Sequence, residues 1–153
     1  MNKISLVIIV FLFMGCANKM LRFEQYSMTI TQPVSSDSTI YLGDEEKFQG
    51  VIYIGPILQQ EKAQISSVKF IQNYGKYFLC ADNFKNIWMI TPQEDGMTGS
   101  YEAIDVTPDD TTDVLTGISF SRYGSKDKTC VKFRYNNKEI FIDRKGSLNE
   151  KCE

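Results

Sequence analysis

The sequence predicts an all-β protein: a single small antiparallel sandwich or barrel with a C-terminal meander and at most one short helix. Short runs rich in β-branched and aromatic residues recur along the chain, which favours strands. Turn-forming residues separate these runs at fairly even spacing, as in sandwiches and barrels, and the pattern does not choose between the two. Only residues 57–66 fit a helix, and that segment is short enough to be a loop.

Alternating apolar and polar residues mark the strands that precede the meander. In the first strand, Met28 and Ile30 alternate with threonines. An acidic turn at residues 43–47 joins the next two strands, and Gly55 and Pro56 break the pattern before the helix candidate. The strands expected here are residues 21–31, 40–42, 48–54, 68–72, 77–81, 87–91 and 101–107.

The C-terminal meander is the most regular part of the pattern. Asn136 and Asn137 join its last two strands, and this pair tolerates the positive φ of a two-residue hairpin turn. In the middle strand, Val131, Phe133 and Tyr135 alternate with Lys132 and Arg134, so the three apolar residues are expected to face the core. The meander strands expected are residues 114–123, 129–135 and 139–143.

The N-terminal segment has the pattern of a secretory signal peptide. Lys3 precedes an apolar run from Ile4 to Met14 in which only Ser5 is polar. A membrane-spanning helix needs roughly 20 apolar residues, so this shorter run fits the apolar region of a signal peptide. We therefore expect residues 1–15 to be removed.

The residues at the end of this run, Phe13-Met14-Gly15-Cys16, resemble the lipobox of bacterial lipoproteins. Gly15 and Cys16 fit that pattern, whereas Phe13 stands where leucine is usual. The resemblance implies cleavage before Cys16 and a diacylglycerol on its sulfur, and acyl chains of this kind hold a protein stably on a membrane. Through Ala17 it also implies a place on the inner leaflet of the outer membrane, facing the periplasm.

On this interpretation, residues 16–20 are a lipidated tether and residues 21–153 form a single all-β domain. The alternative is an ordinary secretory signal peptide that is cut nearby, with Cys16 lost or incidental.

Composition narrows the classes of function. The chain has no histidine, which removes histidine-activated nucleophiles and HExxH zinc sites and lowers the expectation of catalysis. We expect no metal and no cofactor. The net charge of −2 does not favour nucleic acid as a partner.

The four cysteines are Cys16, Cys80, Cys130 and Cys152. If Cys16 carries lipid, at most one disulfide can form among the other three in an oxidising periplasm. We favour Cys130–Cys152, because a cysteine in the polar C-terminal tail makes most sense if it ties that end down. Cys80 lies in an apolar run and is expected to be a buried free thiol, although a Cys80–Cys152 bond stays open.

The charges are segregated along the chain. Residues 86–121 contain no Lys or Arg, and their seven acids are Glu94, Asp95, Glu102, Asp105, Asp109, Asp110 and Asp113. Residues 122–145 contain eight basic residues and three acids. An acidic surface could steer a basic protein partner, with Asp109, Asp110 and Asp113 as candidate contacts. The alternative is that these charges face each other or water, where exposed pairs contribute about 0–1 kcal/mol.

Other uses of these acids are less favoured. The spacing of Asp109, Asp110 and Asp113 does not match a calcium-binding loop. The adjacent pairs Glu94/Asp95 and Asp109/Asp110 point apart on a strand or turn, which does not suit the paired carboxylates of a glycoside hydrolase.

Three further residues are candidate partner contacts. Trp88, the only tryptophan, is expected in the core by default, and it would be an interface anchor if it pointed outward. Arg122 and Tyr123 precede the turn at Gly124 and belong to residue types that are enriched at interface hot spots.

Together these observations predict a non-enzymatic binding protein on the periplasmic side of a membrane. Its small size, its anchor and its acidic segment favour an inhibitor or immunity protein against a secreted toxin or lytic enzyme. An accessory lipoprotein of an envelope assembly or secretion machine is the first alternative, and a carboxylate-dependent hydrolase is the second.

Overall fold

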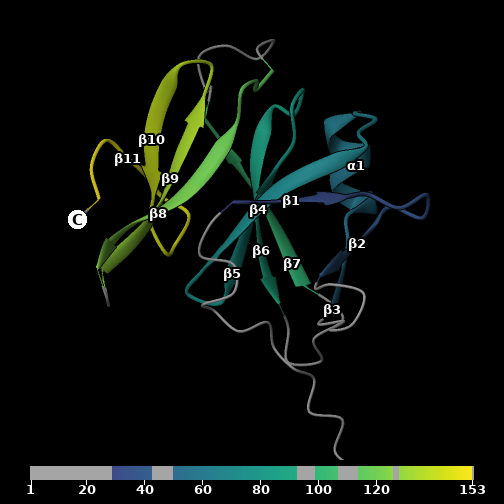
Figure 1. Cartoon of the computed structure of the whole chain (residues 1–153), viewed down its shortest axis with the longest axis horizontal. Helices are drawn as coiled ribbons and strands as arrows, with labels where there is room; N and C mark the ends of the chain where they lie inside the picture. Colours follow the sequence, from purple (N-terminus) through teal and green to yellow (C-terminus); the bar gives the residue numbers. More distant parts are fainter. Residues whose placement is uncertain (1–28, 43–49, 93–98, 107–113, 126–127, 153) are drawn as a thin grey trace, which may run out of the picture.

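The computed structural model of the chain describes residues 29–42, 50–92, 99–106, 114–125 and 128–152 (Figure 1). These residues form eleven strands and one short helix, α1 (Gly55–Glu61). The strands are β1 (Ile30–Pro33), β2 (Thr39–Leu42), β3 (Gly50–Tyr53), β4 (Ser67–Asn73), β5 (Lys76–Cys80), β6 (Asn86–Pro92), β7 (Gly99–Asp105), β8 (Ser119–Ser125), β9 (Lys128–Tyr135), β10 (Lys138–Ile142) and β11 (Leu148–Asn149).

The strands form three antiparallel units. A five-stranded sheet has the order β1-β4-β5-β6-β7, a four-stranded sheet has the order β11-β10-β9-β8, and β2 pairs with β3 as a hairpin. The sheets are open and packed on one another, which is the sandwich rather than the barrel alternative. The predicted all-β class with one short helix is confirmed.

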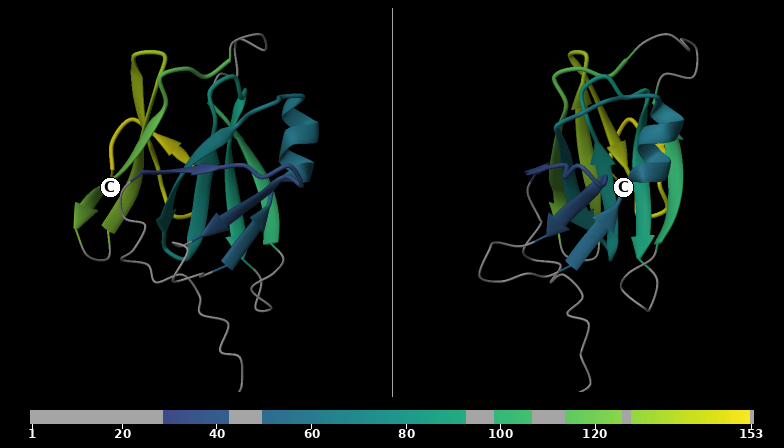
Figure 2. Two further views of the ribbon diagram at one scale, coloured as in Figure 1. Left: turned by 45° about the vertical axis from the view of Figure 1, so that its right-hand side comes forward. Right: turned by 90° about the vertical axis from the view of Figure 1, so that its right-hand side faces the viewer.

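The five-stranded sheet is the middle layer, because both of its faces are buried. Strand register places Phe70, Leu79 and Trp88 side by side on one face, and Phe78 and Met89 on the other. All five side chains are 3% exposed or less. The β2–β3 hairpin and α1 lie over the first face, and the four-stranded sheet lies over the second (Figures 1 and 2).

Polar contacts join these layers. On the face covered by α1, Glu61 accepts a hydrogen bond from Trp88 Nε1. On the other face, Lys69 Nζ donates to the carbonyl oxygen of Ile118, just before β8, at 2.7 Å. A Cβ on Gly146 would lie 3.2 Å from Met89 Cε, so the turn between β10 and β11 rests directly on the five-stranded sheet.

Helix α1 is shorter than the predicted 57–66. Pro56 lies in its first turn, where the missing N–H of proline is tolerated. The helix is capped by Lys62, whose φ of 52° is in the left-handed region that ends many helices. The pattern was therefore right about the presence of a helix and wrong about both ends, because Gly55 and Pro56 begin the helix instead of preceding it.

The C-terminal part differs from the prediction at the start of β8 and in having one further strand, β11. Residues 114–118 are irregular rather than the start of β8. Leu115 accepts from the N–H of Asn83 at 2.9 Å and donates to the carbonyl of Phe84 at 2.7 Å, so its backbone groups serve the loop after β5. The two-residue strand β11 was not predicted, because two residues show no periodicity.

Other local predictions are confirmed. Asn136 and Asn137 have φ values of 45° and 62°, as the two-residue turn requires. Val131, Phe133 and Tyr135 are buried on the inner face of β9. Of the first predicted strand, only residues 29–31 fall within the described part. Its predicted end at Thr31 was wrong, because β1 continues to Pro33, a proline that an edge strand tolerates.

Candidate binding surfaces

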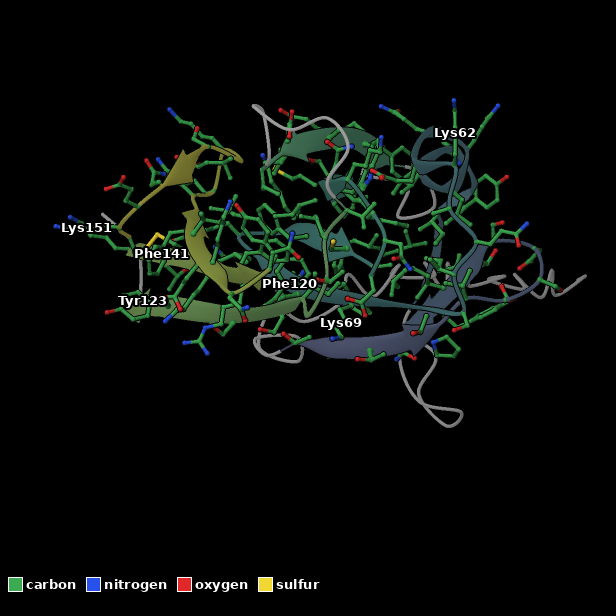
Figure 3. The ribbon with its side chains drawn as sticks, turned by 90° about the horizontal axis from the view of Figure 1, so that it is seen from above. Lys62, Lys69, Phe120, Tyr123, Phe141 and Lys151 are labelled. Atoms are coloured by element: carbon green, nitrogen blue, oxygen red, sulfur yellow. A yellow bond between two sulfur atoms is a disulfide. The ribbon has the colours of Figure 1, made fainter. Side chains whose placement is uncertain are left out.

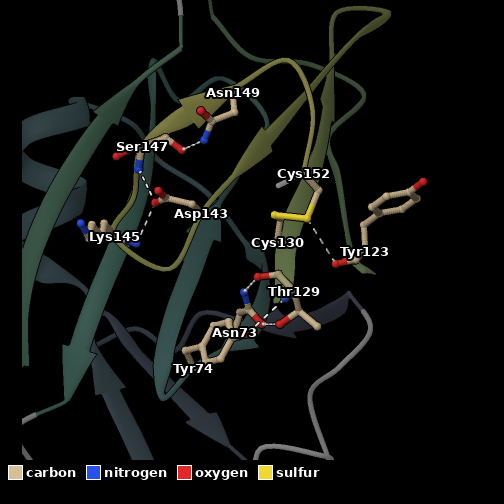
Figure 4. The surroundings of a disulfide bond; sticks show 10 residues. All are labelled: Asn73, Tyr74, Tyr123, Thr129, Cys130, Asp143, Lys145, Ser147, Asn149 and Cys152. Carbon is tan, nitrogen blue, oxygen red and sulfur yellow. Dashed lines mark hydrogen bonds between the residues drawn. A yellow bond between two sulfur atoms is a disulfide. The ribbon is translucent and has the colours of Figure 1, made fainter. Parts of the chain in front are cut away.

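A disulfide bond closes the C-terminal sheet. Cys130 of β9 is joined to Cys152, with the two Cα atoms 5.8 Å apart, which confirms the favoured pairing. Closing a loop across 22 residues contributes roughly 3 kcal/mol on the chain-entropy argument. Figure 4 shows that the bond holds the end of the chain beside Tyr123, with Cys152 Sγ 3.8 Å from the Tyr123 carbonyl oxygen. This is a contact and not a hydrogen bond, because a disulfide sulfur carries no proton.

Cys80 is the free cysteine of the described residues, and it is fully buried. Burial, followed by the nearby charge of Glu61, raises the pKa of the Cys80 thiol far above its ordinary value. The thiol therefore stays protonated, as expected of a structural cysteine.

The outer face of the four-stranded sheet carries a lysine–aromatic cluster of Tyr123, Lys132 and Phe141. The Tyr123 and Phe141 rings meet edge to face with their centroids 5.3 Å apart. Lys132 Nζ lies 5.6 Å from the Tyr123 centroid and 5.8 Å from that of Phe141, within the range of cation–π attraction. Tyr123 is 52% exposed. Figure 3 shows Tyr123 and Phe141 at the end of the molecule away from Lys62, the cap of α1.

Glu139 holds this cluster in place. Its carboxylate lies 2.8 Å from Lys132 Nζ and 2.8 Å from Arg134 Nε. Hydrogen bonds from Lys132 and then from Arg134 lower the pKa of Glu139. The negative charge of Glu139 is therefore balanced by Lys132 and Arg134 on the same face.

Positive charge dominates the rest of this sheet and its turns. Its exposed cations number six and its exposed acids two. By strand alternation, Lys128, Lys132 and Arg134 all point to the outer face of β9. The six exposed cations are Lys128, Arg134, Lys138, Arg144, Lys145 and Lys151, and the two acids are Glu139 and Glu150.

The opposite side of the molecule carries a tyrosine surface of Tyr41, Tyr53 and Tyr101. Tyr41 and Tyr53 are diagonal neighbours on the outward face of the β2–β3 hairpin and are 52% and 53% exposed. Tyr101 of β7 donates its hydroxyl to the Tyr53 carbonyl oxygen at 2.7 Å. Partial burial, followed by the nearby Tyr53, raises the pKa of Tyr101. The Tyr53 ring lies where a Cβ on Gly55 would stand, so a side chain at this position would displace the ring.

The predicted acidic segment is only partly visible. Glu102 and Asp105 are exposed on β7, an edge strand of the five-stranded sheet and the same strand that carries Tyr101. Asp109, Asp110, Asp113, Glu94 and Asp95 lie outside the described residues. Glu102 pairs with Met89 and so points to the face of β7 opposite Tyr101, whereas Asp105 lies on the same face as Tyr101, four residues along the strand. The described acids of the segment therefore share an edge strand with Tyr101, and the basic segment that follows lies on the other sheet.

The remaining sequence candidates lie in different places. Trp88 is 3% exposed, so it is a core residue, the default expectation, and does not offer an outward ring. Arg122 is half-buried between the sheets, where its Nη2 donates to the Gln72 carbonyl at 3.2 Å. Burial lowers the pKa of Arg122. Tyr123 is exposed, as a contact residue must be, and its role stays a prediction.

Sequence reasoning missed Glu61, Tyr41 and Tyr53. Glu61 is 8% exposed, yet it follows two glutamines and precedes Lys62, so nothing in its neighbourhood marks it as buried. Alternation along the strands could have found the two tyrosines, because Tyr41 follows the buried Ile40 and Tyr53 lies between the buried Ile52 and Ile54.

No family model, no curated protein and no solved structure matches this chain. Within the described ranges, no helix is long and apolar enough to cross a membrane. The same ranges contain no cluster of three or more metal-binding side chains.

Proposed function

We propose that this chain is a lipid-anchored, non-enzymatic binding protein of the bacterial envelope, and specifically an inhibitor or immunity protein against a secreted toxin or lytic enzyme. The lipobox-like residues that end at Cys16 support the anchor. The disulfide between Cys130 and Cys152 supports an oxidising compartment. The observation that carries the binding role is the tyrosine surface.

The tyrosine surface suits a protein partner. Tyrosine offers a large contact area for little conformational entropy and is enriched at interface hot spots. The Tyr53 ring packs over Gly55, and the hydrogen bond from Tyr101 holds the backbone carbonyl of Tyr53, so the strand that presents this ring is already ordered. The exposed acid Asp105 lies on the same face of β7 as Tyr101 and favours a basic partner.

Capture from detergent-solubilised envelopes tests the proposal. The variant Tyr41→Ala truncates the tyrosine surface, and Tyr123→Ala is the matched control, since both tyrosines are 52% exposed. Wild type and Tyr123→Ala are expected to retain one stoichiometric protein that Tyr41→Ala loses. Equal retention by all three chains, at equal thermal stability, would show that the tyrosine surface does not bind the partner.

The identity of the captured protein separates the two binding roles. A soluble toxin or lytic enzyme supports inhibition, and a set of membrane proteins supports an accessory role in an assembly. The salt dependence of the purified complex then tests the acidic segment. Replacing Asp109, Asp110 and Asp113 together by Asn is expected to weaken a basic partner's binding mainly at low salt, because exposed charges act through the on-rate.

A further inference from the structure

The four-stranded sheet has a feature that a protein-binding role on the opposite side does not use: its basic outer face with an exposed aromatic pair. We propose that this face, built around Tyr123, Lys132 and Phe141, docks on the anionic lipid surface to which the chain is tethered. The inference rests on the lipid anchor of the proposed function.

The first argument is charge. The described residues 114–152 contain eight basic side chains against three acids, whereas residues 29–106 contain four basic side chains against five acids. Each Lys or Arg close to an anionic membrane contributes about 1 kcal/mol. The attraction fades within roughly 8 Å at physiological salt, so it acts only when this sheet faces the lipid. The charge distribution therefore favours one orientation of the domain.

The second argument is the position of Thr29, the residue at which the described part of the chain begins. Thr29, the first described residue, exchanges hydrogen bonds with Phe120 of β8: its hydroxyl donates to the Phe120 carbonyl, and it accepts from the Phe120 N–H at 2.8 Å. The chain between Cys16 and Thr29 can span at most roughly 45 Å. The first described residue therefore lies against β8, an edge strand of the basic sheet, and not on the tyrosine side.

The third argument is the chemistry of the exposed side chains. Tyrosine rings are enriched at the level of lipid headgroups, where one end of the ring is apolar and the other is polar. Tyr123 is half-exposed beside the partly buried Phe141, and Lys132 and Arg134 flank the pair with positive charge. Because Glu139 is bound to those two cations, its negative charge adds little repulsion of the anionic lipid headgroups. The face thus combines shallow apolar insertion with attraction to phosphate.

Quenching of tryptophan by brominated lipids tests this docking. The full chain is extracted from membranes and reconstituted into vesicles of brominated phosphatidylcholine, alone or with an equal part of phosphatidylglycerol. Tyr123→Trp reports on the basic face, Tyr41→Trp reports on the opposite side at equal parental exposure, and wild type gives the background of buried Trp88. We expect extra quenching only for Tyr123→Trp, only with phosphatidylglycerol, and lost at high salt.

A charge reversal provides the second readout. Lys128→Glu on the basic face is expected to lower the equilibrium constant for docking by roughly tenfold. Lys62→Glu on the far side is expected to leave that constant unchanged. If Tyr123→Trp is quenched no more than Tyr41→Trp in the anionic vesicles, membrane docking is overturned, and an acidic protein becomes the occupant of this face.

Failure of the anchor is recognised separately. A chain with unmodified Cys16 by mass spectrometry that does not sediment with neutral vesicles contradicts the anchored function. Sedimentation with the phosphatidylglycerol vesicles then decides the docking: salt-sensitive binding that Lys128→Glu weakens supports it, and no binding overturns it.

Discussion

The carboxylate of Glu61 accepts a hydrogen bond from Nε1 of Trp88 at 2.8 Å, which joins the end of α1 to strand β6 of the five-stranded sheet. The same carboxylate accepts from the Lys85 N–H at 2.6 Å and from Asn86 Nδ2 at 2.9 Å. A buried carboxylate is costly unless such donors surround it. Glu61 therefore sets the position of α1 on the five-stranded sheet.

Replacing Glu61 by Gln is expected to destabilise the protein by about 2 kcal/mol, because one amide group would point its own donor at the donors of residues 85–88. Trp88→Phe is expected to lower the free energy of unfolding somewhat less, since two of the three hydrogen bonds to the Glu61 carboxylate remain. The two changes together should cost less than their sum, because they share one hydrogen bond. Urea unfolding followed by circular dichroism measures all three variants, and a Glu61→Gln chain as stable as wild type would contradict the account.

Gly124 of β8 makes a close approach that a side chain would block. Its φ is +97°, and an added Cβ would collide with the carbonyl oxygen of Lys128, a backbone atom that cannot turn away. Gly75 is the matched control, because it also has a positive φ of +73° but has open space around it. Gly75→Ala is expected to cost about 1 kcal/mol and Gly124→Ala at least about 2 kcal/mol more. Equal unfolding midpoints for the two variants would contradict the collision.

Alternation along the strands made most of the fold predictable. The meander, the Asn136–Asn137 turn and the buried face of β9 depend on neighbouring residues, so a local pattern is sufficient to find them. The favoured disulfide followed from a cysteine in a polar tail. By contrast, the irregular segment before β8 depends on hydrogen bonds between Leu115 and residues 83–84, which no local pattern records.

The candidate surfaces were harder to predict for the same reason. Segregation of charge along the chain separates an acidic segment from a basic one. It could not show that strand order places the two described acids, Glu102 and Asp105, on a different sheet from the basic residues of the meander. The lysine–aromatic cluster joins β8, β9 and β10, and its members become neighbours only through register. The burial of Glu61 likewise follows from donors more than twenty positions away.

Cysteine labelling separates the three expected states of the cysteines: the buried free thiol of Cys80, the disulfide of Cys130 and Cys152, and the lipidated sulfur of Cys16. In the native protein, alkylation is expected to label none of the cysteines, because Cys80 is buried with a raised thiol pKa and Cys130 and Cys152 are bonded. In denaturant without reductant, Cys80 alone should react if Cys16 carries lipid. A second label under those conditions, assigned to Cys16 by peptide mass spectrometry, would contradict lipidation. Reduction should expose Cys130 and Cys152 and lower stability by roughly 3 kcal/mol.

Acidification tests the role of Glu139 on the basic face. Hydrogen bonds from Lys132 and Arg134 hold the pKa of Glu139 below its ordinary value of about 4.5. A carboxyl group whose pKa is lower in the folded state stabilises that state fully above its unfolded pKa, and this contribution is lost as the pH falls through the folded pKa. The effect on overall stability is expected to be small, because the group is exposed. The local effect should be larger: protonation of Glu139 releases Lys132 from its ion pair and changes the environment of the Tyr123 and Phe141 rings.

Side-chain nuclear magnetic resonance of Glu139 and the Tyr123 ring between neutral and acidic pH measures this coupling. Both signals are expected to shift together, with a midpoint below that of an unpaired glutamate such as one in a denatured peptide. In Glu139→Gln the Tyr123 shift should lose this titration, whereas Tyr41 on the opposite side serves as a ring that does not titrate with Glu139. A Tyr123 signal that is flat through the Glu139 midpoint in wild type would show that the ion pair does not order the cluster.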